Sequence, residues 1–232
     1  MHVVKTEKTT LRKVAMITGV AMIMMALLAM FSVGIVSSRL IVDGDAIGTA
    51  NNIKKSIFLF QAGIFSWLLI LILDVLLSWS LYVFFEPIHR SLSLLAAWFR
   101  LMYTAFLGVA IFQLVQITTL INESESFQLE DLSSSIMLSV MSYEKIWSFG
   151  LIIFAIHLLL IGWMMIKANF IPKILAILML IASVSYMLIH TMDVFLPQLE
   201  KVTGNIESIL SLPMAIGELG LGIWMFIKGG KR

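Results

Sequence analysis

Six ionisable side chains lie inside long apolar stretches of this sequence, where a charged group is costly. They are Asp74, Arg100, His157, His190, Asp193 and Glu218. Ionisable residues within a membrane span mark ion pairs, proton relays or sites for small charged ligands more often than neutral packing. Any chemistry of this chain is therefore expected at these residues.

The stretches that must position these side chains are six apolar runs, each long enough to cross a bilayer. A spanning helix needs about 20 mostly apolar residues. Hydrophobic residues make up 60% of the 232 residues and charged residues 13%, which is too apolar for a soluble domain. We expect an all-α fold, one domain over residues 1–232 and a multi-pass protein of the cell membrane. The runs cover residues 14–36, 57–85, 91–121, 146–166, 174–196 and 208–227.

The depths of four of the ionisable groups are expected to coincide. Helical rise places Asp74 about 18 Å and Arg100 about 20 Å from the inner helix ends, and His157 and Glu218 about 15 Å. A turn near Pro87 would bring Asp74 to the level of Arg100. An unpaired charge there is expensive, so we expect the two to pair. The pair is either a structural clip of the helix hairpin or part of a polar site formed by all four groups.

Glu218 lies on a face of small residues that is suited to close helix contact. Ser211, Ala215, Glu218 and Gly222 recur at helical spacing. The face is either a packing seam alone or the wall of the polar site. If Glu218 is buried, it needs a proton or a cationic partner, and Arg100 and His157 are the candidates.

A second polar face is expected near the outer end of the fifth run. Tyr186, His190 and Asp193 share one side of a helix there and would either bind a cation or meet water at the interface. His190 lies roughly 10 Å above His157 by helical rise, which argues against a haem held between them. The chain has no cysteine. We expect no cofactor, no metal site and no catalytic residue.

The distribution of Lys and Arg predicts that both termini are cytoplasmic. With the N-terminus inside, ten of these residues fall on the inner side and five on the outer side. The outer five are Arg39, Lys54, Lys55, Lys145 and Lys201. The net charge of +2 is spread over helix ends, which does not suggest nucleic acid. The expected partner is the lipid bilayer, and a small ligand or a protein partner stays open.

Two outer connections are long enough to hold structure of their own. Residues 37–56 carry a polar motif of Asp45, Thr49 and Asn52. Residues 124–142 are acidic at first and then carry apolar residues at a spacing that fits either a short helix on the outer surface or a solvated loop.

An ordered set of motifs along nearly the whole chain resembles a known family. The chain is similar to the bacterial integral membrane family catalogued as domain of unknown function 4386. The resemblance implies a six-helix bundle and implies no activity. The matching residues are Asp45-x-x-x-Thr49-Ala50-x-Asn52-Ile53, Leu81-Tyr82, Pro87, Phe99-Arg100, His157, Gly162, Pro172, Tyr186, Glu218, Trp224 and Lys228-Gly229.

Three classes of function fit these features. The favoured one is a non-catalytic bundle, accessory or sensory, that can bind a small ligand at its buried polar site. A small-solute or proton-linked carrier would use the same four residues for binding and proton exchange. A membrane enzyme acting on a lipid or polyprenyl substrate would need a polar cavity that opens to one leaflet. An open path to the cluster favours the carrier, a lateral opening the enzyme, and a closed, satisfied cluster the accessory bundle.

Overall fold

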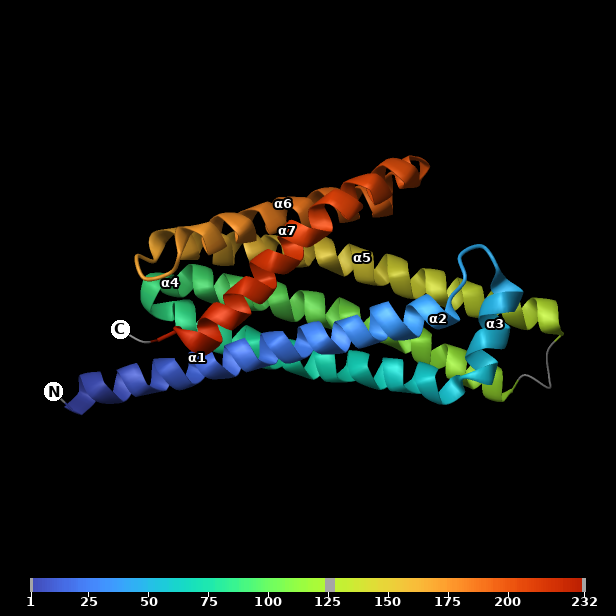
Figure 1. Ribbon diagram of the computed structural model, residues 1–232, viewed down its shortest axis with the longest axis horizontal. Coiled ribbons are helices and arrows are strands. Elements are labelled where there is room, and N and C mark those ends of the chain that lie inside the picture. The colour runs from blue at the N-terminus through green and yellow to red at the C-terminus, as the bar shows by residue number, and fades with distance from the viewer. Residues whose placement is uncertain (1, 124–127, 231–232) are drawn as a thin grey trace. The chain divides into compact units, whose positions relative to one another are not determined.

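The described part of the chain is helical and contains no strand, which confirms the all-α expectation (Figure 1). The computed structural model describes residues 2–123 and 128–230, with side chains for 11–123 and 128–230. Its elements are α1 (His2–Ala29), the π-helix η1 (Met30–Ser37), α2 (Ser38–Leu40), α3 (Ala46–Lys55), α4 (Ile57–Asn122), α5 (Leu129–Lys167), α6 (Lys173–Phe195), the 3₁₀ helix η3 (Pro197–Leu199) and α7 (Glu200–Ile227).

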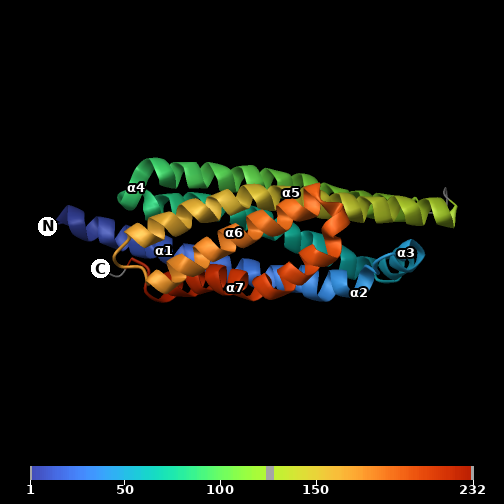
Figure 2. The same cartoon turned by 90° about the horizontal axis from the view of Figure 1, so that it is seen from above.

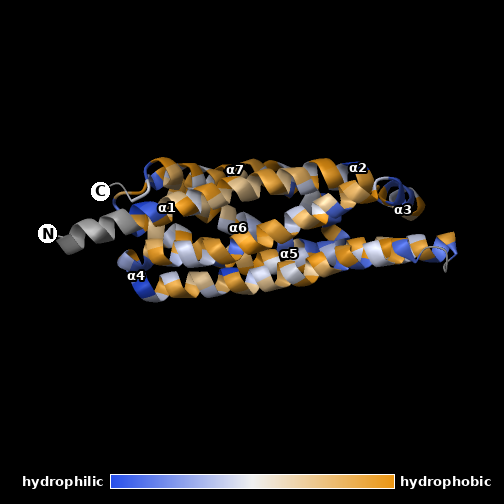
Figure 3. Ribbon diagram, turned by 90° about the horizontal axis from the view of Figure 1, so that it is seen from below, coloured by the Kyte–Doolittle hydropathy of each residue, from blue (hydrophilic) through white to orange (hydrophobic). Residues whose placement is uncertain are grey.

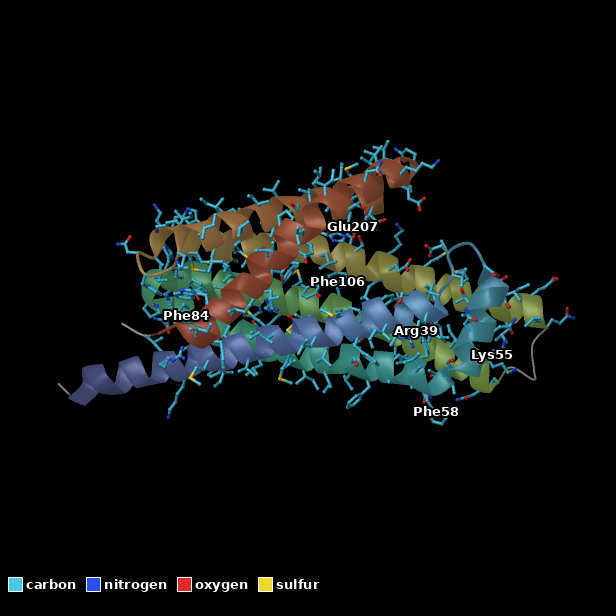
Figure 4. All side chains as sticks on the ribbon, in the orientation of Figure 1. Arg39, Lys55, Phe58, Phe84, Phe106 and Glu207 are labelled. Carbon is cyan, nitrogen blue, oxygen red and sulfur yellow. The ribbon has the colours of Figure 1, made fainter. Side chains whose placement is uncertain are left out.

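Five helical segments among the described residues are long and apolar enough to cross a membrane. They are Leu11–Leu40, Ile57–Asn122, Leu129–Lys167, Lys173–Phe195 and Pro197–Ile227. Hydrophobic residues dominate the ribbons of α1, α4, α5 and α7 in Figure 3. Many large apolar side chains point outward: Phe58, which projects from the start of α4 in Figure 4, is 85% exposed. Lipid is the solvent that suits such a surface, which is consistent with a multi-pass membrane protein.

Helix α4 consists of two helices joined at a sharp break. His89 has φ −160° and ψ 95°, outside the helical region, two residues after Pro87. The imidazole of His89 then accepts a hydrogen bond from the backbone N–H of Leu92 (3.3 Å), as an N-cap residue does. The turn expected near Pro87 is therefore present. Proline supplies no backbone donor for the preceding turn, which weakens the helix at this point.

The chain forms two compact units, which are described separately. Unit 1 holds the residues up to Met24, Leu73–Thr104 and the residues from Ser148 onward. Figures 1 and 2 show α6 and α7 of this unit side by side, joined through η3. The first part of α1 packs tightly on the end of α7: a Cβ at Gly19 would lie 2.6 Å from the carbonyl oxygen of Gly222. Small residues allow such close helix contact.

Unit 2 holds Met25–Ile72 and Ala105–Trp147. The hydroxyl of Ser32 in η1 donates to the carbonyl of Gly63 in α4 (3.2 Å). The ring of Trp67 contacts that of Trp147 edge to face at 5.0 Å and that of Tyr143 at 6.0 Å. A cavity of about 20 Å³ lies beside these aromatic residues and η1. It has room for about one water molecule.

The two connections that were predicted to lie outside contain more helix than the sequence suggested. Residues 129–142 form neither a separate surface helix nor a loop, because α5 begins at Leu129 and continues unbroken to Lys167. Leu132, Ile136 and Val140 are buried at four-residue spacing, so one face of the helix is covered from its first turns. Residues 124–127 of this connection lie outside the described part. The expectation of one domain over residues 1–232 stays a prediction.

Candidate functional site

Asp74 and Arg100 form a buried ion pair between the two halves of α4. Nη2 of Arg100 donates to Oδ1 of Asp74 at 2.5 Å, and the residues are 0% and 4% exposed. Two further bonds fix the register of the hairpin: Ser78 donates to the carbonyl of Ala97 (2.9 Å), and Ser93 donates to that of Tyr82 (2.8 Å). The predicted contact is thus present, and the hairpin turn is what sets it.

His157 of α5 lies on the other side of the guanidinium. Its Nε2 lies 3.2 Å from Nη1 of Arg100, and its Nδ1 lies 2.8 Å from the carbonyl oxygen of Ala96. A guanidinium can only donate and a carbonyl can only accept. Nε2 must therefore be the acceptor and Nδ1 must carry the proton, so His157 is held as a neutral imidazole. At 1% exposure, the residue is enclosed.

Phe154 joins these groups to the next helix, and sequence reasoning did not identify it. The guanidinium carbon of Arg100 lies 5.3 Å from the centre of its ring, within the range of a cation–π contact. The ring also stacks on His157 at 5.5 Å and meets Tyr186 edge to face at 5.5 Å. The only available signal was its place three residues before His157, on the same face of a helix.

Glu218 of α7 is held by a residue that was expected in a different site. The hydroxyl of Tyr186 donates to Oε1 of Glu218 at 2.9 Å. Glu218 lies in the electrostatic field of both Arg100 and Asp74, but its hydrogen-bond partner is neither Arg100 nor His157. The two polar faces expected separately from the sequence are therefore linked through Tyr186.

The small-residue face proposed for α7 is correct only in part. Gly222 is buried and would meet Met22 if it carried a Cβ, but Ser211 and Ala215 are exposed. The buried face instead follows Met214, Gly217, Leu221, Gly222 and Met225. Glu218 is half-buried at the edge of this face. The helix is rotated relative to the expected seam because bulky apolar residues compete with the small ones for the interior.

The rest of the outer face on α6 lies next to the same tyrosine. The imidazole of His190 stacks on the ring of Tyr186 at 5.6 Å, and its Nδ1 lies 2.9 Å from the hydroxyl of Ser148 in α5. Asp193 is half-buried and acts electrostatically on His190. Among the described residues, no group of three His, Cys, Asp or Glu side chains is placed to hold a metal ion.

The motif of Asp45, Thr49 and Asn52 belongs to unit 2, where two of its residues organise the start of α3. The carboxylate of Asp45 accepts a hydrogen bond from the backbone N–H of Gly48 (2.7 Å), which is an N-cap. The hydroxyl of Thr49 accepts from the backbone N–H of Val42 (2.9 Å). Asn52 is half-buried in the same helix. These contacts account for the motif as a local fold signal.

Two atoms of the ion pair have no hydrogen-bond partner among the described residues: Oδ2 of Asp74 and Nε of Arg100. One is an acceptor and the other a donor, so the pair keeps hydrogen-bonding capacity inside the protein. The arrangement encloses an ion pair and holds the carboxyl group of Glu218, which can exist with or without its proton. The role of these residues as a functional site stays a prediction.

The helices and their enclosed charges define a class: a helical integral membrane protein that keeps ionisable groups inside its bundle. Within this class, the family described as Domain of unknown function (DUF4386) matches residues 17–229, and the chain belongs to that family.

One further protein is similar to this chain. An uncharacterized protein of Archaeoglobus fulgidus is 28% identical over 180 residues, which cover 78% of this chain and 89% of that protein. The expectation of a bacterial family is not confirmed, because this similar protein is archaeal. No solved structure matches the chain.

Proposed function

We propose that this chain is a six-span protein of the cell membrane, with both termini cytoplasmic, that works as a non-catalytic accessory or sensory bundle. Its working centre would be the buried polar site of Asp74, Arg100, His157 and Glu218. The partners would be the bilayer and a ligand or protein that biases the state of this site.

The length of α4 supports six spans. A straight helix of its 66 residues would measure about 99 Å, against a hydrocarbon core of about 30 Å. The break at His89 divides it into residues 57–88 and 90–122, each long enough for one span. With α4 counted twice, the five apolar segments supply six crossings. The excess of Lys and Arg on the inner side supports the orientation.

The observation that carries the functional proposal is the enclosure of Arg100. Its guanidinium is almost completely buried, donates to Asp74 and faces the neutral imidazole of His157. A carrier site must open to water in turn on each side, and an enzyme must admit its substrate. A buried ion pair with only Oδ2 of Asp74 and Nε of Arg100 left unbonded among the described residues instead suits an element with discrete states that a partner or ligand biases.

The test is a flux measurement on the purified protein in liposomes that contain a pH-sensitive dye. After a proton gradient is imposed and the membrane potential is clamped, the protein should dissipate the gradient no faster than protein-free liposomes do. A sensory bundle should nevertheless change its conformation when the pH outside changes. A cysteine placed at the exposed Ser91 should change its labelling rate when the outside is acidified. Rapid proton flux would overturn the proposal.

A proton-linked carrier is the second candidate, and one feature favours it. Beyond the enclosed ion pair, the hydrogen bond from Tyr186 to Glu218 is followed on α6 by His190, which is only half-buried. Chains of acidic and histidine side chains within membrane spans are a recurring feature of proton relays. The same liposome measurement separates the candidates, because a carrier would collapse the gradient and the closed bundle would not.

A further inference from the structure

Polar side chains continue from Glu218 along α6 towards the end where α6 and α7 are joined. Tyr186, His190 and Asp193 follow one another at four and three residues, so they share one face of α6. They span about 10 Å along the helix axis. This face is the only part of α6 on which several titratable groups are aligned within its described residues.

The contacts along this face are close. Tyr186 donates to Glu218 at 2.9 Å. The rings of Tyr186 and His190 are stacked, with 5.6 Å between centres and 22° between planes. Nδ1 of His190 lies 2.9 Å from the hydroxyl of Ser148, which holds the imidazole from α5. Three helices therefore fix the orientation of two groups that can accept and release protons.

The groups of this face are partly accessible, and an exposed carboxylate lies on the neighbouring α7. Tyr186, His190 and Asp193 are half-buried, and Glu207 on α7 is exposed (Figure 4). Asp193 acts electrostatically on both His190 and Glu207. Glu207 and Glu218 are eleven residues apart, three turns and about 16 Å, which puts both carboxylates on one side of α7. Asp193 therefore places a carboxylate beyond His190 on α6, with Glu207 within its electrostatic range.

The charges around Glu218 allow its carboxyl group to gain or lose a proton. Groups from two neighbouring helices act on it: Tyr186 of α6, and Asp74 and Arg100 of α4. Arg100 is already neutralised by Asp74, and His157 is neutral in its bonded form. Tyr186 is further influenced by Tyr103 of α4 and by Glu207. Glu218 can thus gain or lose one proton without breaking the buried ion pair.

We infer that Glu218 is a proton-binding site that is filled from the outer side through His190 and Tyr186. The inference deepens the proposed function and takes the identity of the outer side from its topology. A proton from outside is accepted by the imidazole of His190, which releases one from its other nitrogen. The hydroxyl of Tyr186 passes its proton to the carboxylate of Glu218. The oxygen of Tyr186 then takes up the proton that the imidazole stacked on its ring releases. The net change is one carboxylate converted to a carboxylic acid, with both relay groups restored.

The experiment is infrared difference spectroscopy on the full chain, oriented in liposomes, after a rapid drop in the outer pH. The carbonyl band of a protonated carboxylic acid should appear in the unmodified protein and be lost in Glu218→Gln. Tyr186→Phe keeps the ring and its packing but removes the hydroxyl. It should slow the appearance of the band by roughly tenfold or more, and His190→Gln should do the same.

The matched control is Ser183→Ala on the same helix. Ser183 donates to the carbonyl of Ala155 (2.8 Å), a buried bond that includes neither Tyr186 nor Glu218, so its removal should leave the rate unchanged. A band that persists in Glu218→Gln overturns the assignment. A band that rises equally fast after acidification of the inside overturns the outer route.

The thermal midpoint of Tyr186→Phe, compared with that of the unmodified protein, separates a loss of fold from a loss of relay. A folded Tyr186→Phe that takes up protons at the normal rate also overturns the route. The test of Glu218 and the test of the proposed function can therefore fail separately. Proton flux in liposomes would reject the closed bundle and leave the Glu218 assignment intact, whereas loss of the assignment leaves the flux result untouched.

Discussion

Arg100 is the residue with the most varied contacts in the site: a carboxylate, an imidazole and an aromatic ring face one guanidinium. A lysine could not reproduce this set, because its ammonium group lacks the planar fork of donors. The cost of removing either member of the ion pair is therefore expected to exceed the cost of losing one ordinary hydrogen bond.

We predict that Asp74→Asn and Arg100→Gln each destabilise the protein by about 3–5 kcal/mol, and that the double variant loses much less than their sum. Each single change leaves one buried charge without its partner, and the double change removes both charges. The measurement is a denaturant unfolding cycle in detergent. Additive losses would show that the two groups do not interact.

The exposed pair of Arg90 and Glu86 is the control for this cycle. Its atoms are 3.3 Å apart, but the arginine side chain is 79% exposed. Surface pairs contribute about 0–1 kcal/mol. Arg90→Gln should therefore be almost neutral, and a large loss there would mean that the cycle reports on something other than burial.

We also predict that His157 is a neutral imidazole with its proton on Nδ1. The donors of Arg100 face Nε2, and the carbonyl of Ala96 faces Nδ1. Nitrogen-15 NMR of histidine-labelled protein distinguishes the two tautomers and the charged ring, with His157→Gln assigning the signal. A proton on Nε2, or a charged imidazole, would contradict the geometry.

The sequence was informative about the residues whose chemistry is unusual for their surroundings. Asp74 and Arg100 could be paired from helical rise and a turn near Pro87, because the turn sets the register of the two helices and an unpaired buried charge is costly. Phe154 could not be identified, because a phenylalanine in an apolar run is normally core. The bond between Tyr186 and Glu218 depends on the rotation of two helices, and apolar residues on all sides of a span leave that rotation unspecified.

At the scale of elements, hydrogen bonds from Arg12 join α1 to the C-terminal end of α7. Its guanidinium donates to the carbonyls of Phe226 (2.7 Å), Gly229 (2.8 Å) and Met225 (3.2 Å). The last carbonyls of a helix lack partners within the helix, and a cation there also interacts favourably with the helix dipole. The bonds link α1 and α7 at one point of unit 1.

We predict that Arg12→Ala lowers the free energy of local opening at the end of α7 by about 1–2 kcal/mol. Hydrogen exchange of the amides in residues 224–230 should become faster, while that of α6 stays as it is. The neighbouring Lys13 is exposed, and Lys13→Ala should leave the exchange unchanged. Equal effects of the two changes would mean that charge alone, rather than the three hydrogen bonds, holds this end.

The crossing of α1 and α7 gives a prediction that depends on backbone distance. A methyl group at Gly19 would lie 2.5 Å from the backbone nitrogen of Phe226, so α1 would have to move away. Gly19→Ala should cost about 1–3 kcal/mol. At Gly204, on the same α7, an added Cβ meets nothing within 4 Å, and Gly204→Ala should stabilise by about 0.5–1 kcal/mol. A neutral Gly19→Ala in the same unfolding assay would contradict the contact.

The start of α5 is an element boundary that was predicted incorrectly from the sequence. Its acidic residues, Glu130 and Asp131, resemble those of a loop, but they also suit the first turn of a helix. The buried residues that follow lie at a spacing that both a surface helix and an extended α5 satisfy. Only the covering of one face, which sequence periodicity does not reveal, distinguishes them.

At the scale of the whole molecule, the orientation can be tested because the chain has no native cysteine. We predict that an impermeant maleimide applied to intact cells labels a cysteine at Asp43, in the loop before α3, and does not label one at Ser91 or Lys228. All three positions are exposed. Permeabilised cells, in which all three should react, provide the control. Labelling at Lys228 with none at Asp43 would invert the topology, and labelling at Ser91 alone would place the α4 hairpin turn outside.

The ion pair within α4 also has a consequence for how the chain enters the membrane during synthesis. Each half of α4 carries one buried charge within its apolar part, and a charged residue deep in the membrane opposes insertion of an isolated span by about 3 kcal/mol. Both charges belong to one hairpin and neutralise each other across it. The second half is therefore expected to help the first to leave the translocation channel, so that the two spans partition into lipid as a single unit.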